Sequence, residues 1–242
     1  IICQVINPNN RYEISFRTHK CINLSNGIYA RARFFMKNYI QSSKTFRYFT
    51  LGNPEKAKKI LFVLHGYGQL PEYFIQKFND LGDEYFIVAP EGMHRFYLKG
   101  SSGRVGASWM TKEERLTDIS DTINYLNTLY THVAKQFDMN QISILGFSQG
   151  AAAAARWFYS NEKLASQLII WASVFPPDLE RSSEINPSNS LSNKFVIGKQ
   201  DEFFDEQQQN ELMHFYKENG FEVFRFDGKH DIDPSTLTRV LS

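Results

Sequence analysis

The sequence has few cysteines, no long apolar run and almost no net charge, and each of these absences excludes a class of protein. Cys3 and Cys21 are the only cysteines, so no disulfide and no cysteine-based metal site holds together the later residues. No apolar run approaches the roughly 18–20 residues that a membrane-spanning helix needs. We therefore expect no metal site and no membrane insertion. Scarce cysteine is also typical of a reducing compartment, so we expect a cytoplasmic location.

The net charge of +1 hides an uneven distribution along the chain. Residues 1–50 are rich in Lys and Arg, with Glu13 as their only acid, whereas the remainder is mildly acidic. The larger part therefore offers no electrostatic reason to bind nucleic acid. Residues 1–45 lack clear periodicity and are interpreted as an N-terminal extension of doubtful status. The native protein could begin at Met36, the first methionine; a poorly ordered tail or an edge strand pair is the alternative.

From residue 46 onward, apolar runs alternate with amphipathic stretches. The runs predict strands over 59–64, 84–89, 141–146, 167–172, 194–198 and 221–226. Helices are predicted over 71–81, 113–137 and 205–219, after 148 and after 234, while 91–111 is interpreted as a long loop. Such alternation predicts an α/β domain over 46–242, with a mostly parallel sheet covered by helices on both faces. The stretch 173–192 is too short for a large cap domain.

The pentapeptide Gly146-Phe147-Ser148-Gln149-Gly150 follows an apolar strand and precedes an alanine-rich helix. This is the context of the G-x-S-x-G nucleophile elbow, which exposes a serine hydroxyl at a sharp strand-to-helix turn. The turn leaves no room for side chains two residues before and after the serine, and glycine satisfies both positions. The sequence therefore predicts Ser148 as a catalytic nucleophile.

A serine nucleophile needs a histidine base, and the base needs an orienting carboxylate. His230 follows the last apolar strand, on a loop at the strand edge where sites of open α/β sheets lie. Asp201 follows the preceding strand and gives the chain order Ser–Asp–His. Asp205 is the runner-up for the acid, although it more readily caps the following helix, and Asp178 is a weaker rival. Among the other histidines, His94 lies on the 91–111 loop and could line the site, and His65 is expected to shape a turn. His132 and His214 are expected to face solvent on long helices, and His19 belongs to the N-terminal extension.

The same chemistry needs two N–H donors for the oxyanion. The residue after the nucleophile supplies one, so we expect the backbone N–H of Gln149 to be a donor. The loop after the first apolar strand supplies the other, and within His65-Gly66-Tyr67-Gly68 we assign it to the N–H of Tyr67. The alternative for this segment is an ordinary strand-to-helix turn.

Together these residues resemble the phospholipase/carboxylesterase family of α/β-hydrolases, which includes the acyl-protein thioesterases. The resemblance extends from about residue 46 to the end of the chain. It rests on LHGYG at 64–68, SWM at 108–110, GFSQG at 146–150, GKQDEF at 198–203 and GKH at 228–230. It implies an α/β-hydrolase fold, a triad of Ser148, Asp201 and His230, and oxyanion donors at Tyr67 and Gln149. Family members often carry Leu where this chain has Tyr67, which makes the rim of the site more aromatic.

The resemblance implies a cytosolic serine hydrolase that cleaves carboxylic esters, acyl thioesters or lysophospholipids through an acyl-enzyme, without a cofactor. We expect a small-molecule ester or thioester substrate and a monomer or homodimer. Two alternatives stay open: a non-catalytic binding protein of the same fold, and a serine peptidase. We further expect an open aromatic groove that binds the acyl chain. Its predicted lining residues are Phe96, Tyr97, Trp109, Phe175 and Phe203; for Trp109, packing in the core is the alternative.

Overall fold

The computed structural model describes residues 36–161, 164–180 and 193–242. The chain divides into two units, 1–45 and 46–242, and the second unit carries the sheet and the helices that follow. Residues 37–45 form no helix or strand and are exposed. The interpretation of residues 1–35 as an extension lies outside the described residues. No helix among the described residues has both the length and the apolar character needed to cross a membrane.

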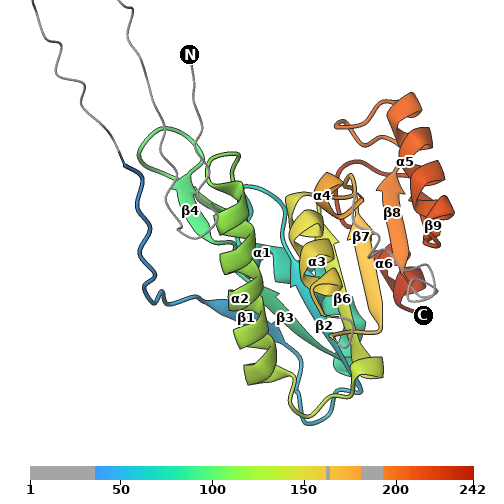
Figure 1. The fold of residues 1–242 in the computed structure, drawn as a ribbon. Helices are drawn as coiled ribbons and strands as arrows, with labels where there is room; N and C mark the ends of the chain where they lie inside the picture. Colours follow the sequence, from blue (N-terminus) through green and yellow to red (C-terminus); the bar gives the residue numbers. More distant parts are fainter. Residues whose placement is uncertain (1–35, 162–163, 181–192) are drawn as a thin grey trace, which may run out of the picture. The chain divides into compact units, whose positions relative to one another are not determined.

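A seven-stranded sheet forms the centre of the second unit (Figure 1). Its strand order is β1-β3-β2-β6-β7-β8-β9, and every pairing is parallel except the antiparallel pairing of β1 with β3. The strands are β1 (Tyr48–Leu51), β2 (Lys59–Leu64), β3 (Tyr85–Pro90), β6 (Ile142–Phe147), β7 (Gln167–Trp171), β8 (Lys194–Gly198) and β9 (Glu222–Phe226). The predicted mostly parallel α/β sheet is therefore confirmed.

Helices cover both faces of this sheet. They are α1 (Pro71–Phe74), η1 (Ile75–Glu84), α2 (Arg115–Val133), η2 (Met139–Gln141), α3 (Gln149–Tyr159), α4 (Pro177–Glu180), α5 (Glu206–Glu218) and α6 (Pro234–Leu241). Successive side chains of β2 point to opposite faces: Phe62 joins one buried cluster with residues of α2, α3 and α5, and Val63 joins another with residues of η1 and α6. Figure 1 shows α2 and α3 on the near face of the sheet. Burial on both faces explains why the strands are apolar throughout.

The segment 91–111, interpreted from the sequence as a loop, contains a two-stranded hairpin. Strand β4 (His94–Tyr97) pairs antiparallel with β5 (Val105–Ser108). The hairpin strands are short, and β4 is mostly exposed, so they lack the apolar run by which the sheet strands were recognised. Backbone hydrogen bonds between Gly68 and Ala107 (2.9 Å) and between Ala107 and Gln69 (3.0 Å) fix the hairpin against the loop after β2.

A buried histidine joins the ends of β2 and β3. His65 is fully buried; its Nε2 accepts a hydrogen bond from the N–H of Gly92 (3.0 Å), and its Nδ1 lies 2.8 Å from the carbonyl oxygen of Gly66. Because Nε2 accepts, the proton is on Nδ1 and the ring is neutral. Burial disfavours the charged form and lowers the pKa of His65 to about 4.

An ion pair that is buried only on the arginine side connects α3 to α4. The guanidinium of Arg156, on α3, donates to both carboxylate oxygens of Asp178 at 2.8 and 2.6 Å. Only 3% of the Arg156 side chain is exposed, against 41% of the Asp178 side chain. The hydrogen bonds from Arg156 hold the pKa of the Asp178 carboxyl below its usual range. Asp178, the weaker rival for the catalytic acid, is thus engaged in a structural pair.

We predict that His65 makes the fold sensitive to acid. The folded-state pKa of about 4 lies below the ordinary value of 6.5, so protonation favours the unfolded chain. Stability is complete above pH 6.5 and falls as the pH drops toward 4, by up to about 3 kcal/mol. Urea unfolding at pH 7 and pH 4 should show a smaller pH dependence for His65→Gln than for the wild type. His132→Gln, at an exposed site on α2, is the matched control. If all three proteins lose the same free energy of unfolding between pH 7 and pH 4, the prediction is contradicted.

A second prediction concerns the asymmetry of the Arg156–Asp178 pair. Asp178→Leu leaves a buried guanidinium without its counter-ion and should cost about 3 kcal/mol of unfolding free energy. Arg156→Met leaves a carboxylate that water still reaches, so it should cost clearly less. Denaturant unfolding of both variants and of the double variant completes a thermodynamic cycle. The double variant should be more stable than Asp178→Leu, and the reverse order would contradict this account.

Candidate active site

The turn between β6 and α3 has the geometry of a nucleophile elbow. Ser148 adopts φ 53° and ψ −122°, a backbone conformation that residues with side chains rarely adopt. A side chain on Gly146 would collide with the backbone of Gly150 and Ala151. One on Gly150 would collide with the carbonyl oxygens of Leu64 and His65. Both glycines are therefore required by close backbone contacts on the two sides of the serine.

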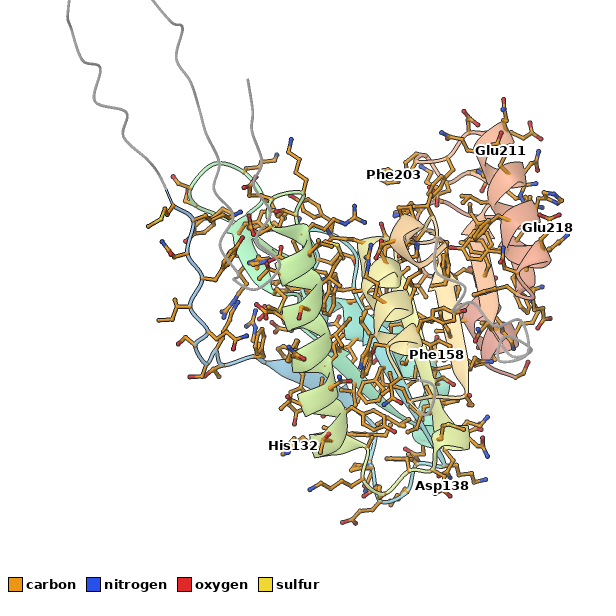
Figure 2. The ribbon with its side chains drawn as sticks, viewed as in Figure 1. His132, Asp138, Phe158, Phe203, Glu211 and Glu218 are labelled. Atoms are coloured by element: carbon orange, nitrogen blue, oxygen red, sulfur yellow. The ribbon has the colours of Figure 1, made fainter. Side chains whose placement is uncertain are left out.

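Three loops bring polar side chains to the same edge of the sheet. Ser148, Asp201 and His230 follow β6, β8 and β9, which are parallel, so all three lie at the carboxyl end. The loops after β8 and β9 are joined directly, since the N–H of Gln200 donates to the carbonyl oxygen of Gly228 at 2.9 Å. Figure 2 shows Phe203 at this end of the molecule, away from His132 and Asp138 at the opposite end.

Asp201 and His230 are joined by a buried hydrogen bond. Asp201 Oδ2 lies 2.8 Å from His230 Nδ1, and the carboxylate is fully buried. The other oxygen, Oδ1, accepts the N–H of Phe203 at 3.0 Å, which fixes the plane of the carboxylate. An ionised carboxylate only accepts, so Nδ1 of the neutral imidazole carries the proton and Nε2 remains available as a base.

The imidazole of His230 lies between two aromatic rings. Its centroid is 4.8 Å from that of Phe147, the residue before the nucleophile, and 4.4 Å from that of Phe203. The contact with Phe147 brings the base to the elbow. The Ser148 side chain makes no capping hydrogen bond to α3, so its hydroxyl is not engaged by the helix that it precedes.

The other acidic candidates have different partners. Asp205, the runner-up, accepts the N–H of Gln208 and caps α5. Asp233 caps α6 in the same way through the N–H of Thr236, whereas Asp231 forms an ion pair with Lys77 at 2.6 Å.

Two residues that the sequence analysis did not single out hold the loop of His230. The indole N–H of Trp171 donates to the carbonyl oxygen of Asp231 at 2.9 Å, and Glu202 Oε2 accepts the backbone N–H of His230 at 3.3 Å. Trp171 ends a predicted strand and lies outside the quoted motifs, whereas Glu202 lies within GKQDEF, directly after Asp201, but the motif does not indicate its contact with His230. A sequence pattern does not reveal such tertiary contacts.

The two expected oxyanion donors are backbone N–H groups without a protein acceptor in the described part of the chain. In the loop after β2, the N–H of Gly66 donates to Gln69 Oε1 at 2.8 Å, and those of Gly68 and Gln69 also have backbone acceptors. The N–H of Tyr67 has no such acceptor. Gln149 is the first residue of α3, so its N–H has no carbonyl one turn earlier in the helix.

The five aromatic residues expected to line a groove differ in their exposure. Tyr97 and Phe203 are 49% and 66% exposed, and the ring of Phe96 packs at a tilt against that of Tyr67, with centroids 5.0 Å apart. Trp109 is fully buried, and its indole N–H donates to the carbonyl oxygen of His65 at 2.8 Å. Phe175 is also in the core. Its ring contacts Tyr159, Phe215, Tyr216 and Phe221.

The described residues contain no group of three or more His, Cys, Asp or Glu side chains that could hold a metal ion. His94, which could have lined the site, instead faces α2, where its Nε2 lies 3.1 Å from a carboxylate oxygen of Asp118. What the described arrangement offers is a strained serine, a buried histidine–carboxylate pair and two N–H donors, a set suited to acyl transfer.

Several solved esterases have the same fold as this chain. Esterase PE8 aligns with a TM-score of 0.63 at 17% identity, over 82% of this chain and 98% of its own. The carboxylesterase from Mesorhizobium loti aligns with a TM-score of 0.63 at 16% identity, over 81% of this chain and 94% of its own. The acyl-protein thioesterase 2 of Zea mays aligns with a TM-score of 0.58 at 16% identity, over 81% of this chain and 99% of its own. The expected resemblance to carboxylesterases and acyl-protein thioesterases is thereby confirmed at the level of the fold.

No curated protein matches the sequence closely enough to count as a relative. The family described as "Serine hydrolase (FSH1)" matches residues 54–239, which include the elbow and the loops of Asp201 and His230. Since this match spans most of the chain, the protein belongs to the FSH1 family of serine hydrolases.

Proposed function

We propose that the protein hydrolyses carboxylic esters or thioesters of small molecules through Ser148, His230 and Asp201. The observation that carries this proposal is the 2.8 Å hydrogen bond between buried Asp201 and His230, whose ring adjoins the residue preceding the strained Ser148. A buried carboxylate is costly unless it has a partner, and here it orients a base toward a serine elbow. We further propose that the enzyme works as a monomer or homodimer without a cofactor.

In the first half of the reaction, Ser148 Oγ attacks the carbonyl carbon while His230 Nε2 takes its proton. The carbonyl oxygen becomes an oxyanion, which the N–H groups of Tyr67 and Gln149 stabilise. Asp201 keeps the proton on Nδ1 and stabilises the imidazolium that forms. When the tetrahedral intermediate collapses, the imidazolium gives its proton to the departing alcohol or thiol, and an ester bond to Ser148 remains.

In the second half, water replaces the departed alcohol or thiol. His230 Nε2 takes a proton from the water as its oxygen attacks the acyl carbon, and the same two N–H groups hold the second oxyanion. Collapse returns the proton to Ser148 Oγ and releases the carboxylic acid. Ser148 and His230 return to their starting protonation states, so the proposed cycle needs no oxidant, reductant or metal.

Aromatic side chains at the surface support the proposal that the substrate has an apolar part. Tyr67, Phe96 and Tyr97 belong to the loop after β2 and to the hairpin bonded to it, and Phe203 lies against His230. We propose that these four residues contact the apolar part of the substrate. Trp109 and Phe175 are buried and would reach a substrate only if the core opened, so the proposed contact surface is smaller than the five-residue groove.

The proposed function predicts that Ser148 is required for all turnover. The test is a series of p-nitrophenyl esters of increasing acyl length, together with an acyl-CoA thioester. Ser148→Ala should lower kcat/KM by roughly 10⁴-fold or more, because both half-reactions pass through this oxygen. A fluorophosphonate probe should label the wild type but not this variant.

Ser143→Ala is the matched control, because the Ser143 hydroxyl, on β6 just before the elbow, contacts Gln167 and takes no part in the proposed chemistry. Folded wild-type protein that neither turns over an ester nor reacts with the probe would favour a non-catalytic binding protein. A sharp preference for bulky branched acids over linear ones would contradict the proposed aromatic contact surface.

A further prediction separates Asp201 from Asp205. Asp201→Asn loses the negative charge that stabilises the imidazolium and favours the wrong tautomer of His230, so kcat should fall by about 10³- to 10⁴-fold. Asp205→Asn keeps a good helix cap and should leave kcat close to that of the wild type. Steady-state kinetics on one ester decides between them, and comparable losses in both variants would refute the assignment of the acid.

A further inference from the structure

The side-chain amide of Gln149 is hydrogen-bonded at both its oxygen and its nitrogen to the segment 108–110. Its Oε1 accepts the N–H of Trp109 at 3.0 Å and lies 3.1 Å from the hydroxyl of Ser108, while its Nε2 donates to the carbonyl oxygen of Met110 at 2.9 Å. These three partners are all buried. The SWM segment and the GFSQG elbow, recognised separately in the sequence, are thus joined through one amide.

The hydrogen bonds continue from Trp109 to the loop of the second donor. The indole N–H of Trp109 donates to the carbonyl oxygen of His65 at 2.8 Å, and the rings of Trp109 and His65 are 5.1 Å apart. His65 is two residues before Tyr67. A continuous path therefore runs from Gln149 through the backbone and indole of Trp109 to the loop that presents the N–H of Tyr67.

The two donor segments also touch directly. Gly150, next to Gln149, approaches the carbonyl oxygens of Leu64 and His65 so closely that no Cβ fits between them. This contact sets how near the segments can come, but backbone carbonyls facing a glycine do not stop one segment from sliding along the other. Directed hydrogen bonds do, because they weaken steeply when their geometry changes.

The spacing of these donors matters more to a transition state than to a bound substrate. Two N–H groups stabilise an oxyanion only when both lie about 2.7–3.1 Å from the position that the oxygen will occupy. The ground-state carbonyl carries less charge, so a small displacement affects it less. Whatever fixes the two donors relative to each other therefore acts on kcat before it acts on KM.

We propose that the side chains of Gln149 and Trp109 form a brace that sets the distance between the oxyanion donors, the N–H groups of Gln149 and Tyr67. This inference rests on the proposed function and adds two positioning side chains to it. Neither side chain touches the reacting atoms: the indole is fully buried, and the Gln149 amide is occupied by its three partners.

The chain provides a matched pair of tryptophans for the test. Trp109→Phe removes the indole N–H that holds His65, and Trp157→Phe removes one that donates to Asn127 Oδ1 at 2.9 Å. Both tryptophans are fully buried, so both changes remove one buried hydrogen bond and similar volume. Gln149→Met, with Gln167→Met as its control, tests the other half of the brace without a large change in shape.

The measurements are kcat and KM for a p-nitrophenyl ester, and the inhibition constant of a boronic acid, whose serine adduct is tetrahedral. Trp109→Phe and Gln149→Met should lower kcat by about 10- to 100-fold and leave KM within about threefold. The boronic acid should bind more weakly by a similar factor, while binding of the product acid stays unchanged. Trp157→Phe and Gln167→Met should lose thermal stability but retain kcat.

The outcomes separate the brace from the proposed function. If the wild type is active, Ser148→Ala is inactive and Trp109→Phe and Gln149→Met match their controls, the brace is refuted and the serine mechanism stands. A rise in KM at constant kcat also refutes it. If Ser148→Ala retains the wild-type rate, the proposed function itself fails. Should Trp109→Phe not fold, the Gln149→Met pair decides the question alone, since this side chain is only partly buried.

Discussion

The backbone contact between the start of α3 and the ends of β2 and β6 is the constraint on which the site depends. Gly146 and Gly150 allow the helix to begin directly against the strands, and Ser148 takes up a strained conformation between them. The strain costs of order 1–3 kcal/mol and persists because the surrounding structure over-determines it. The parallel sheet provides these surrounding contacts. The carbonyl oxygen of Trp171, at the end of β7, accepts the N–H of Ser148, and the end of β2 lies against Gly150.

Much of this arrangement could be predicted from sequence because it is local. The apolar runs marked every parallel strand of the sheet, and the elbow motif located Ser148 by its glycines. Asp201 and His230 were expected together because loops after parallel strands meet at one edge, and they lie 2.8 Å apart there. Their catalytic role is a proposal, but their proximity followed from topology.

The features that the sequence did not predict are those that depend on the tertiary contacts of individual side chains. Leu116 is an apolar residue of the helix predicted over 113–137, yet in the first turn of α2 it is 79% exposed. Trp109 and Phe175 were expected to line the acyl-binding groove, yet an aromatic residue near a motif fits a core equally well, and both are buried. Two acidic residues precede α6, and the structure gives them different partners: Asp233 caps the helix, whereas Asp231 pairs with Lys77. Aromatic and acidic side chains have several acceptable environments, so tertiary contacts decide among them.

The hairpin of β4 and β5 has a different character from the rest of the site. Its base is bonded to the loop that carries Tyr67, but nothing lies within 4 Å of where a side chain would project from Gly100 or Gly103 at its tip. A side chain at Gly100 or Gly103 would meet no neighbouring atom, but the positive φ of both residues would be strained in any residue other than glycine, whereas a methyl group added at Gly146 or Gly150 meets backbone. The open surroundings of the tip leave space for added residues, so the hairpin can change in length without displacing the edge of the sheet that carries Ser148, provided that the two glycines keep their turn.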